Sequence, residues 1–326
     1  MTINHPLYGR FNITEPVLID LINSPALRRL KRISQHGCWQ FYRFGPEKFN
    51  RFEHSLGVLL LLRKFGAPIE EQIAGLLHDV SHTAFSHVGD RLFGRELTQD
   101  YQDSKLVKAF DLQGINKILK KHEFKPEIIL DFSKFNLLET ELPDLCADRL
   151  DYTFQDPAEK KINGAAAKKL LKKLRVYKNR FVFADRASAE GFGRLYLKLN
   201  QLVWCNPKQV TLFVLLAQAL KIGLEKNIIS KKDLFTDDQT VRNKLQAAKN
   251  PEIAEKFRLM KNLRIKIVPK NQVLGCSKTK IRIVDPGFLK NGKLIRLSAI
   301  DQDYKNKIAA FKKWAKNGFC VKILNK

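Results

Sequence analysis

The sequence lacks the long apolar segment that a membrane-spanning helix would need. Its two longest strictly apolar stretches end at Arg63 and at Gln218 after only a few residues, whereas a span needs about 20. The first residues, MTINHPLYGRFNIT, also lack the charged-then-apolar pattern of a signal peptide. We therefore expect a soluble, cytoplasmic protein without a membrane partner.

Cysteine is scarce, with five residues among 326, and no two of them form a CxxC pair. Their odd number and wide spacing argue against a disulfide framework and against a structural zinc knuckle. We expect free thiols in a reducing compartment.

Acidic residues are few compared with basic ones, since 33 Asp and Glu face 59 Lys and Arg, giving a net charge of +26. A basic surface attracts polyanions, so nucleic acid bound through such a surface is one expected partner. The lysines are spread along the whole chain, however, and a general lysine-rich composition explains much of the charge equally well.

The sequence contains no P-loop, Rossmann fingerprint or nucleophile elbow, but its histidines are clustered. Four of the seven fall between residues 54 and 87, as His54, His78, His82 and His87, and Asp79 adjoins the second. Imidazole and carboxylate groups are the usual ligands of catalytic transition metals. Apolar residues flank these histidines, which indicates that they are partly buried. Buried polar groups that converge on one point need a binding partner. This cluster predicts a metal-dependent hydrolase.

Helical patterns occupy most of the first two-thirds of the chain. Ser24 and Pro25 are typical of a helix start, and Leu27, Leu30 and Ile33 then share one face. Further helices are expected at 53–65, 68–80, 104–111, 114–121, 125–132, 142–155, 187–227 and 301–317. A hairpin is expected at 174–185, and RIKIVP, KIRIVDP, LIRL and FCVKIL after residue 262 are expected strands. The fold class is mainly α, with a helical core over 1–230 and a smaller mixed α/β C-terminal region over 231–326.

Helical spacing also predicts how the metal cluster assembles. His78 and His82 are four residues apart and would share a helix face, whereas His54 must come from a neighbouring helix. A later carboxylate is still needed, and the segment LPDLCADRLDYTFQD offers four. Three of them could share one helical face, and the candidates are Asp144, Asp148, Asp151 and Asp156.

Two other stretches have competing interpretations. Aromatic residues at 39–52 alternate with Arg43, Lys48 and Arg51, which suits a base-stacking platform or ordinary core packing beside a loop. The basic amphipathic stretch AKKLLKKL at 167–174 suits a solvated helix face, or less readily a contact with nucleic acid or a second subunit.

Four motifs in order resemble the HD-domain phosphohydrolase superfamily. INHPLYGRF at 3–11, RFEHSLGV at 51–58, AGLLHDVSHTAFSH at 74–87 and ADRLDY at 147–152 are similar to its deoxynucleoside triphosphate triphosphohydrolase branch. That branch includes the dGTP triphosphohydrolases and the sterile-alpha-motif HD-domain enzyme. The resemblance spans residues 3–156 and continues weakly through KIRIVDP. It implies an HD-domain helical core, metal-dependent phosphohydrolysis of a nucleotide and a homo-oligomer.

The resemblance also implies roles for individual residues. It implies metal ligation by His54, His78, Asp79 and Asp148, and catalytic roles for His82, His87 and Asp79. It implies substrate binding by Gln35, Arg51, Arg149, Tyr152 and Asp156. The expected cofactor is a divalent transition metal, with Mn, Fe, Zn, Co and Ni not distinguished and Mg also open.

The chain departs from the branch at several positions. Asp100 and Tyr101 stand where an HExxS-like stretch would supply histidine and glutamate, Ser81 replaces a glycine, and VWCNPKQ surrounds Trp204. We expect metal-activated water to hydrolyse a (deoxy)nucleoside triphosphate to nucleoside and tripolyphosphate. The alternatives are a phosphodiesterase or nuclease on single-stranded nucleic acid, and a catalytically impaired nucleotide-binding protein.

Overall fold

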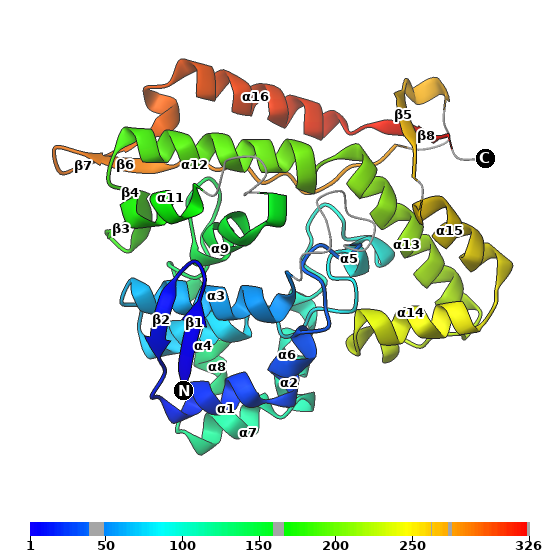
Figure 1. Ribbon diagram of the computed structural model, residues 1–326, viewed down its shortest axis with the longest axis horizontal. Helices are drawn as coiled ribbons and strands as arrows, with labels where there is room; N and C mark the ends of the chain where they lie inside the picture. Colours follow the sequence, from blue (N-terminus) through cyan, green and yellow to red (C-terminus); the bar gives the residue numbers. More distant parts are fainter. Residues whose placement is uncertain (39–48, 159–165, 262, 273–275, 325–326) are drawn as a thin grey trace.

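The structure is a computed structural model that describes residues 1–38, 49–158, 166–261, 263–272 and 276–324. Most of the aromatic stretch that could form a stacking platform, residues 39–48, lies outside the described residues. Helices dominate, as the mainly α prediction requires (Figure 1). None of the described helices combines the length and apolarity needed to cross a bilayer.

The elements follow one another along the chain in three groups. The first is β1 (Thr2–His5), β2 (Gly9–Asn12), α1 (Pro16–Asn23), α2 (Pro25–Leu30), α3 (Arg51–Lys64), α4 (Ile69–Leu77), α5 (Val88–Leu92), α6 (Leu106–Leu112), α7 (Ile115–Lys121), α8 (Pro126–Ile129) and α9 (Ala147–Gln155). The second is α11 (Ala167–Lys173), β3 (Leu174–Tyr177), β4 (Arg180–Phe183), α12 (Arg186–Leu199) and α13 (Pro207–Glu225). The third is α14 (Asp238–Ala247), α15 (Pro251–Lys261), β5 (Ile265–Val268), β6 (Gly287–Lys290), β7 (Lys293–Arg296), α16 (Gln302–Asn317) and β8 (Cys320–Ile323).

Helix α3 lies at the centre of the helical core and packs against α2, α4 and α9. Its N-cap Asn50 accepts a hydrogen bond from the Glu53 backbone, and its side chains from Phe52 to Leu62 are buried apart from Glu53. Because it is apolar almost all round, it is a core helix rather than a surface one. A histidine in its first turn is therefore buried.

The close approach of α3 and α9 depends on a glycine. A Cβ atom at Gly57 would overlap Asp151 Oδ1 and Gln155 Nε2 of α9. This glycine thus allows the polar face of α9 to reach the first turns of α3, where the candidate site forms.

The predicted hairpin at 174–185 is present and belongs to a larger sheet. Its strands β3 and β4 join β6 and β7 in the order β3-β4-β6-β7, with β4 and β6 parallel at Phe183 and Phe288. Strands β5 and β8 form a separate antiparallel pair. The four-stranded sheet therefore links both sides of the domain boundary that we predict at residue 230, and that boundary stays a prediction.

The expectation of a strand at KIRIVDP is wrong, because the described residues 280–286 pair with no strand. Their alternation has another cause. Lys280 and Arg282 line a cavity, whereas Ile281 and Ile283 pack against the apolar cluster around Phe311. Two different environments on opposite sides of an extended chain produce the same period-two pattern as a sheet.

The single helical stretch expected at 187–227 is interrupted. A π-helical turn at Asn200–Trp204 separates α12 from α13, and Asn206 and Pro207 begin the second helix. Such turns change the direction in which side chains project. Here the turn places Trp204 beside Tyr152 and Tyr196, with ring centroids 5.0 and 5.1 Å away.

The expectation that all five cysteines are free thiols is wrong. Cys276 and Cys320 form a disulfide, whereas Cys38, Cys146 and Cys205 are free and buried. The neighbouring residues Ser277 and Phe319 exchange two backbone hydrogen bonds, which bring the two cysteines together across 44 residues of sequence. Linear spacing gives no sign of such a contact.

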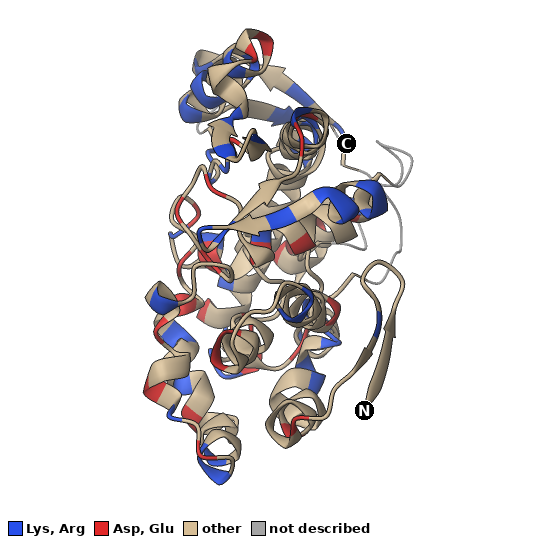
Figure 2. Ribbon diagram, turned by 90° about the vertical axis from the view of Figure 1, so that its left-hand side faces the viewer, with Lys and Arg blue, Asp and Glu red and all other residues tan. Residues whose placement is uncertain are grey.

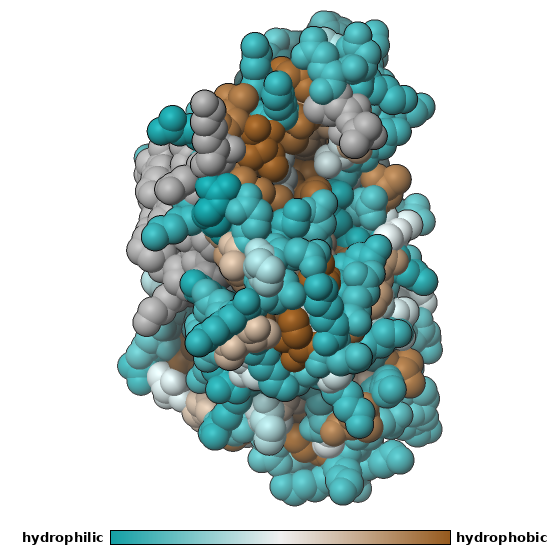
Figure 3. Space-filling model, turned by 90° about the vertical axis from the view of Figure 1, so that its right-hand side faces the viewer, coloured by the Kyte–Doolittle hydropathy of each residue, from teal (hydrophilic) through white to brown (hydrophobic). Residues whose placement is uncertain are grey.

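Figure 3 shows that hydrophilic side chains cover most of the right-hand face of the molecule, with one larger apolar area in its upper half.

Candidate metal centre and substrate cavity

Three residues from three helices converge on one buried point. His54 lies in the first turn of α3, His78 follows the end of α4, and Asp148 lies in the first turn of α9. His54 Nε2 is 3.0 Å from Asp148 Oδ1 and 3.2 Å from His78 Nε2, and their ligand atoms all lie within 4.8 Å of one another. This spacing suits a single metal ion between them.

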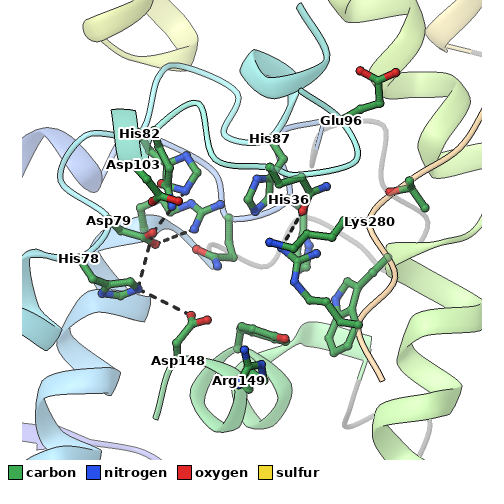
Figure 4. A pocket seen from close by; sticks show the side chains of 18 of the residues that line it. His36, His78, Asp79, His82, His87, Glu96, Asp103, Asp148, Arg149 and Lys280 are labelled. Atoms are coloured by element: carbon green, nitrogen blue, oxygen red, sulfur yellow. Dashed lines mark hydrogen bonds and ion pairs between the residues drawn. The ribbon is translucent and has the colours of Figure 1, made fainter. Parts of the chain in front are cut away.

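Asp79 faces the same point (Figure 4). Its carboxylate oxygens lie 3.7 Å from His54 Nε2 and 3.6 Å from His78 Nε2, and it is almost completely buried. Arg51 donates to Asp79 Oδ2 at 2.6 Å, so burial, which would raise the pKa of Asp79, is outweighed by the Arg51 charge and that pKa is well below its ordinary value. Asp79 is therefore an anion oriented by Arg51.

Outer hydrogen bonds fix both imidazoles. Asp151 Oδ2 accepts from His54 Nδ1 at 2.7 Å, and the carbonyl of Gly75 accepts from His78 Nδ1 at 2.7 Å. Asp151 is itself held by Tyr8 Oη at 2.5 Å and by Gln155 Nε2. Each Nε2 is thereby turned toward the cluster, as in most histidine metal sites.

The helix expected at 142–155 begins later, at Ala147, so the aspartates of this segment have different surroundings. Asp144 precedes the helix and pairs with Arg180 and Arg296 rather than facing the cluster. Asp148 enters the cluster, and Asp151 supports it from behind. The shared helical face that we expected therefore holds only for the last two.

The electrostatics of the cluster favour a bound cation. Burial lowers the pKa of His54, but hydrogen bonds to Asp148 and Asp151 outweigh it and raise that pKa to about 10. Burial likewise opposes ionisation of Asp148, yet hydrogen bonds from His54 and His78 lower its pKa. Two imidazoles among buried carboxylates therefore stabilise positive charge at this point, and this donor set fits a divalent transition metal.

His82 and His87 lie on the other side of Asp79, with their rings 5.1 Å apart. His82 Nε2 is 3.3 Å from Asp79 Oδ1, and burial together with the Arg51 charge lowers the pKa of His82 to about 3. Burial also lowers the pKa of His87, although its Nδ1 lies 2.9 Å from Asp90 Oδ2. Both imidazoles are therefore neutral near neutral pH.

A cavity of about 410 Å³ opens in front of the cluster. Five cationic side chains line it, from segments far apart in the sequence: Arg51, Arg91, Arg149, Lys280 and Arg282. Cavities of this size hold small molecules. Arg51 Nη2 and Gln35 Oε1 are buried there without hydrogen-bond partners among the described residues, so they are free to bind a ligand.

Of the remaining residues implied by the resemblance, some line the cavity and one does not. Gln35, Tyr152 and Arg149 line the cavity, but Arg149 also donates to Glu139 Oε1 at 2.7 Å. Asp156 is not among the residues that line the cavity. Its carboxylate accepts from Trp204 Nε1 at 3.0 Å and from the backbone of Ala158 at 2.8 Å.

Several cavity residues escaped the sequence reasoning. Arg91, Lys280 and Arg282 supply positive charge, and Asp103 and Glu96 supply carboxylates. The only sequence signal was the alternation in KIRIVDP, which we interpreted as a strand. Asp100, in the segment that departs from the branch, is half-buried and pairs with Arg95.

Comparisons with known proteins agree with this geometry. The family model "HD domain" matches residues 51–154. The uncharacterized protein YdhJ of Bacillus subtilis is 38% identical over 99% of both chains. The metal-dependent phosphohydrolase cns2 of Cordyceps militaris is 30% identical over 89% of this chain and 85% of its own length.

Two further likenesses support less, because one is partial and the other concerns the fold alone. Human deoxynucleoside triphosphate triphosphohydrolase SAMHD1 is 38% identical, but over only 40% of this chain and 24% of its own. The crystal structure of a phosphohydrolase from Bacteroides thetaiotaomicron superposes over the full length of both chains with a TM-score of 0.73 at 18% identity, which shows the fold alone. From the domain match and the near full-length relatives, this chain belongs to the HD-domain family of metal-dependent phosphohydrolases.

Proposed function

We propose that this phosphohydrolase acts on (deoxy)nucleoside triphosphates and releases nucleoside and tripolyphosphate. The observation that carries the proposal is that one cavity of about 410 Å³ is lined both by His78, Asp79 and Asp148 of the His/Asp cluster and by five cationic side chains. A walled cavity of this size suits a mononucleotide, whereas a nuclease acting on a strand needs a groove that follows the backbone.

The metal would be held by His54, His78, Asp79 and Asp148, which offer two imidazoles and two carboxylates at one point. A bound divalent ion would lower the pKa of a water molecule and polarise a phosphoryl oxygen. Asp151 and the Gly75 carbonyl keep the two imidazoles oriented for this role.

The cationic side chains support binding of the phosphates. Arg51 uses Nη1 for Asp79 and Nε for Ser86, which leaves Nη2 for a phosphate oxygen. Lys280 and Arg282 approach from the extended C-terminal segment on another wall. Guanidinium groups fork onto phosphate oxygens, so a triphosphate would be bound from more than one side.

The nucleoside would occupy the part of the cavity near Tyr152, Trp204 and Gln35. The hydroxyls of Tyr152 and Tyr196 are 2.5 Å apart, and the Trp204 ring meets Tyr152 edge-on. The partial likeness to SAMHD1, named as a deoxynucleoside triphosphate triphosphohydrolase, supports this substrate class.

His82 would pass a proton to the leaving oxygen. Burial and Arg51 lower the pKa of His82 to about 3, so without substrate the imidazole is neutral near neutral pH and cannot act as an acid. A triphosphate beside it would neutralise the Arg51 charge and raise that pKa toward neutrality, so the ring would take a proton from water and then pass it to the leaving oxygen. The substrate would thereby create the acid that its own cleavage requires.

The test is product analysis after metal loading. The protein would be incubated with dNTPs, NTPs and short single-stranded oligonucleotides, and the products separated by ion-exchange chromatography. The variant Asp79→Ala removes one proposed metal ligand, and Asp303→Ala on the exposed face of α16 is the matched control. Tripolyphosphate and nucleoside from the wild type and the control, but not from Asp79→Ala, would support the proposal.

The other outcomes assign the alternatives. Cleaved oligonucleotides with intact dNTPs would identify a nuclease or phosphodiesterase. Metal and nucleotide binding without turnover would identify a catalytically impaired binding protein.

A further inference from the structure

Positive charge is concentrated at one end of the molecule, away from the catalytic cavity. Residues 167–184, which form α11, β3 and β4, contain seven Lys and Arg and no Asp or Glu. Residues 287–296, which form β6 and β7, contain three more and again no acidic residue. Figure 2 views this end, where blue predominates along α11 and the strand after it.

The fold brings these two segments together. Strands β4 and β6 are neighbours in one sheet, and Tyr177 Oη donates to the Gly292 carbonyl at 3.2 Å, so the turns of both hairpins lie side by side. Six exposed lysines lie on these two segments and form no ion pair with the described residues. We call them the basic face: Lys168, Lys169, Lys172, Lys178, Lys290 and Lys293.

A second cavity, of about 560 Å³, lies at the edge of the basic face. Lys64, Lys168, Lys172 and Arg175 line it together with apolar side chains that include Leu7, Phe65, Leu171 and Leu174. Its lining, within the part of the chain that the structure describes, contains no acidic side chain. Apolar walls with a cationic rim suit a nucleobase joined to phosphate.

We propose that the basic face and this cavity bind single-stranded nucleic acid. A row of lysines would follow the sugar–phosphate backbone, and the cavity would receive an unstacked base. An anionic membrane fits less well, because the apolar side chains Ala167, Leu170 and Leu171 of α11 are packed in the core and none is left to enter a bilayer.

This binding is independent of the catalytic reaction. The two cavities share no lining residue, and none of the basic-face lysines lines the catalytic one. Loss of nucleic-acid binding should therefore leave hydrolysis of a small phosphoester unchanged, which also reports that each variant is folded.

Fluorescence anisotropy of the full chain with a labelled 20-nucleotide single strand tests the proposal. One variant, K168Q/K169Q/K172Q, removes the helical half of the face, and another, K178Q/K290Q/K293Q, removes the sheet half. The matched control K305Q/K312Q/K313Q removes the same charge from exposed positions of α16. Each face variant should bind at least about tenfold more weakly, and its salt slope, d log K/d log [salt], should fall by about two, since each lost phosphate contact contributes about 0.7.

Three results would overturn the proposal. The first is wild-type protein that does not bind the strand, and the second is equal weakening by the α16 control, which would mean that only net charge matters. The third is binding to phosphatidylserine vesicles, abolished by the face variants, without binding to the strand. Retained hydrolysis with selectively weakened strand binding would support it.

Discussion

Asp151 does not face the metal cluster, yet replacing it should weaken metal binding. Its Oδ2 accepts from His54 Nδ1 at 2.7 Å, so Nε2, which is directed at Asp148 and His78, is the nitrogen that must give up its proton when a metal binds. The variant Asp151→Asn keeps the size of the side chain in a fully buried position. An amide nitrogen turned toward Nδ1 would move the imidazole proton to Nε2, the atom that must bind the metal.

The expected magnitude follows from this geometry. Loss of a carboxylate behind a metal-bound histidine costs about 10- to 100-fold in metal affinity, or roughly 1.4 to 2.7 kcal/mol. Turning the amide oxygen toward Nδ1 would reduce the loss, but the amide nitrogen would then face the Tyr8 hydroxyl and Gln155 Nε2, both of which donate to Asp151 in the wild type. The measurement is isothermal titration of metal-free protein with Mn²⁺, together with turnover.

Two variants sharpen the test. Tyr8→Phe removes one hydrogen bond to Asp151 while leaving its charge, so the affinity should fall by less than tenfold. Asp144→Asn alters a neighbouring aspartate that pairs with Arg180 and Arg296, and should leave Mn²⁺ affinity unchanged. Unchanged affinity in folded Asp151→Asn, or an equal loss in Asp144→Asn, would refute the reasoning.

Four further outcomes are expected. Mn²⁺ affinity should rise as the pH approaches 10, because His54 must lose a proton to bind the metal. Its pKa is about 10 since hydrogen bonds to Asp148 and Asp151 outweigh burial. Calorimetric titration in buffers of different ionisation enthalpy should show about one proton released for each metal ion bound. In metal-free protein the raised pKa of His54 also contributes to the free energy of unfolding. This contribution is complete below about pH 6.5 and should be lost as the pH rises toward 10, and the stability of His54→Ala should not show this loss. Arg51→Ala should raise KM for the triphosphate by at least about tenfold in steady-state kinetics, and unchanged KM would exclude a phosphate contact. Cys276→Ser should lower the free energy of unfolding by up to about 4 kcal/mol in urea titrations, because the bridge closes a loop of 44 residues, and an unaffected midpoint would mean that the bond is absent in solution.

Local sequence was a good guide where local rules decide the structure. Ser24 caps α2 as its hydroxyl and the following proline predict, and Leu27, Leu30 and Ile33 are all fully buried. His54, His78 and Asp148 could be selected because their motifs point to one centre. Such features depend on backbone hydrogen bonding and side-chain period, which are written within a few residues. The expectation that His78 and His82 share a helix face is wrong, because α4 ends at Leu77, before both histidines.

Local patterns misled where one pattern has several causes. The alternating KIRIVDP segment has a cavity on one side and an apolar cluster on the other, so its period does not mean pairing. The apolar stretch around residues 187–227 gave no sign of the π-helical turn that directs Trp204 toward Tyr152. Both outcomes depend on what packs against the segment.

The sequence alone thus determined the helical class and the family and selected the members of the His/Asp cluster that we propose as metal ligands, because helix signals and short motifs are local. Tertiary structure decided the rest. It placed Asp151 behind His54 and Asp156 against Trp204, brought Lys280 and Arg282 into the cavity, and joined Cys276 to Cys320. Each of these contacts joins residues that are tens of positions or more apart in the sequence. Contacts of this kind depend on the packing free energy of the whole core rather than on the propensity of any one segment.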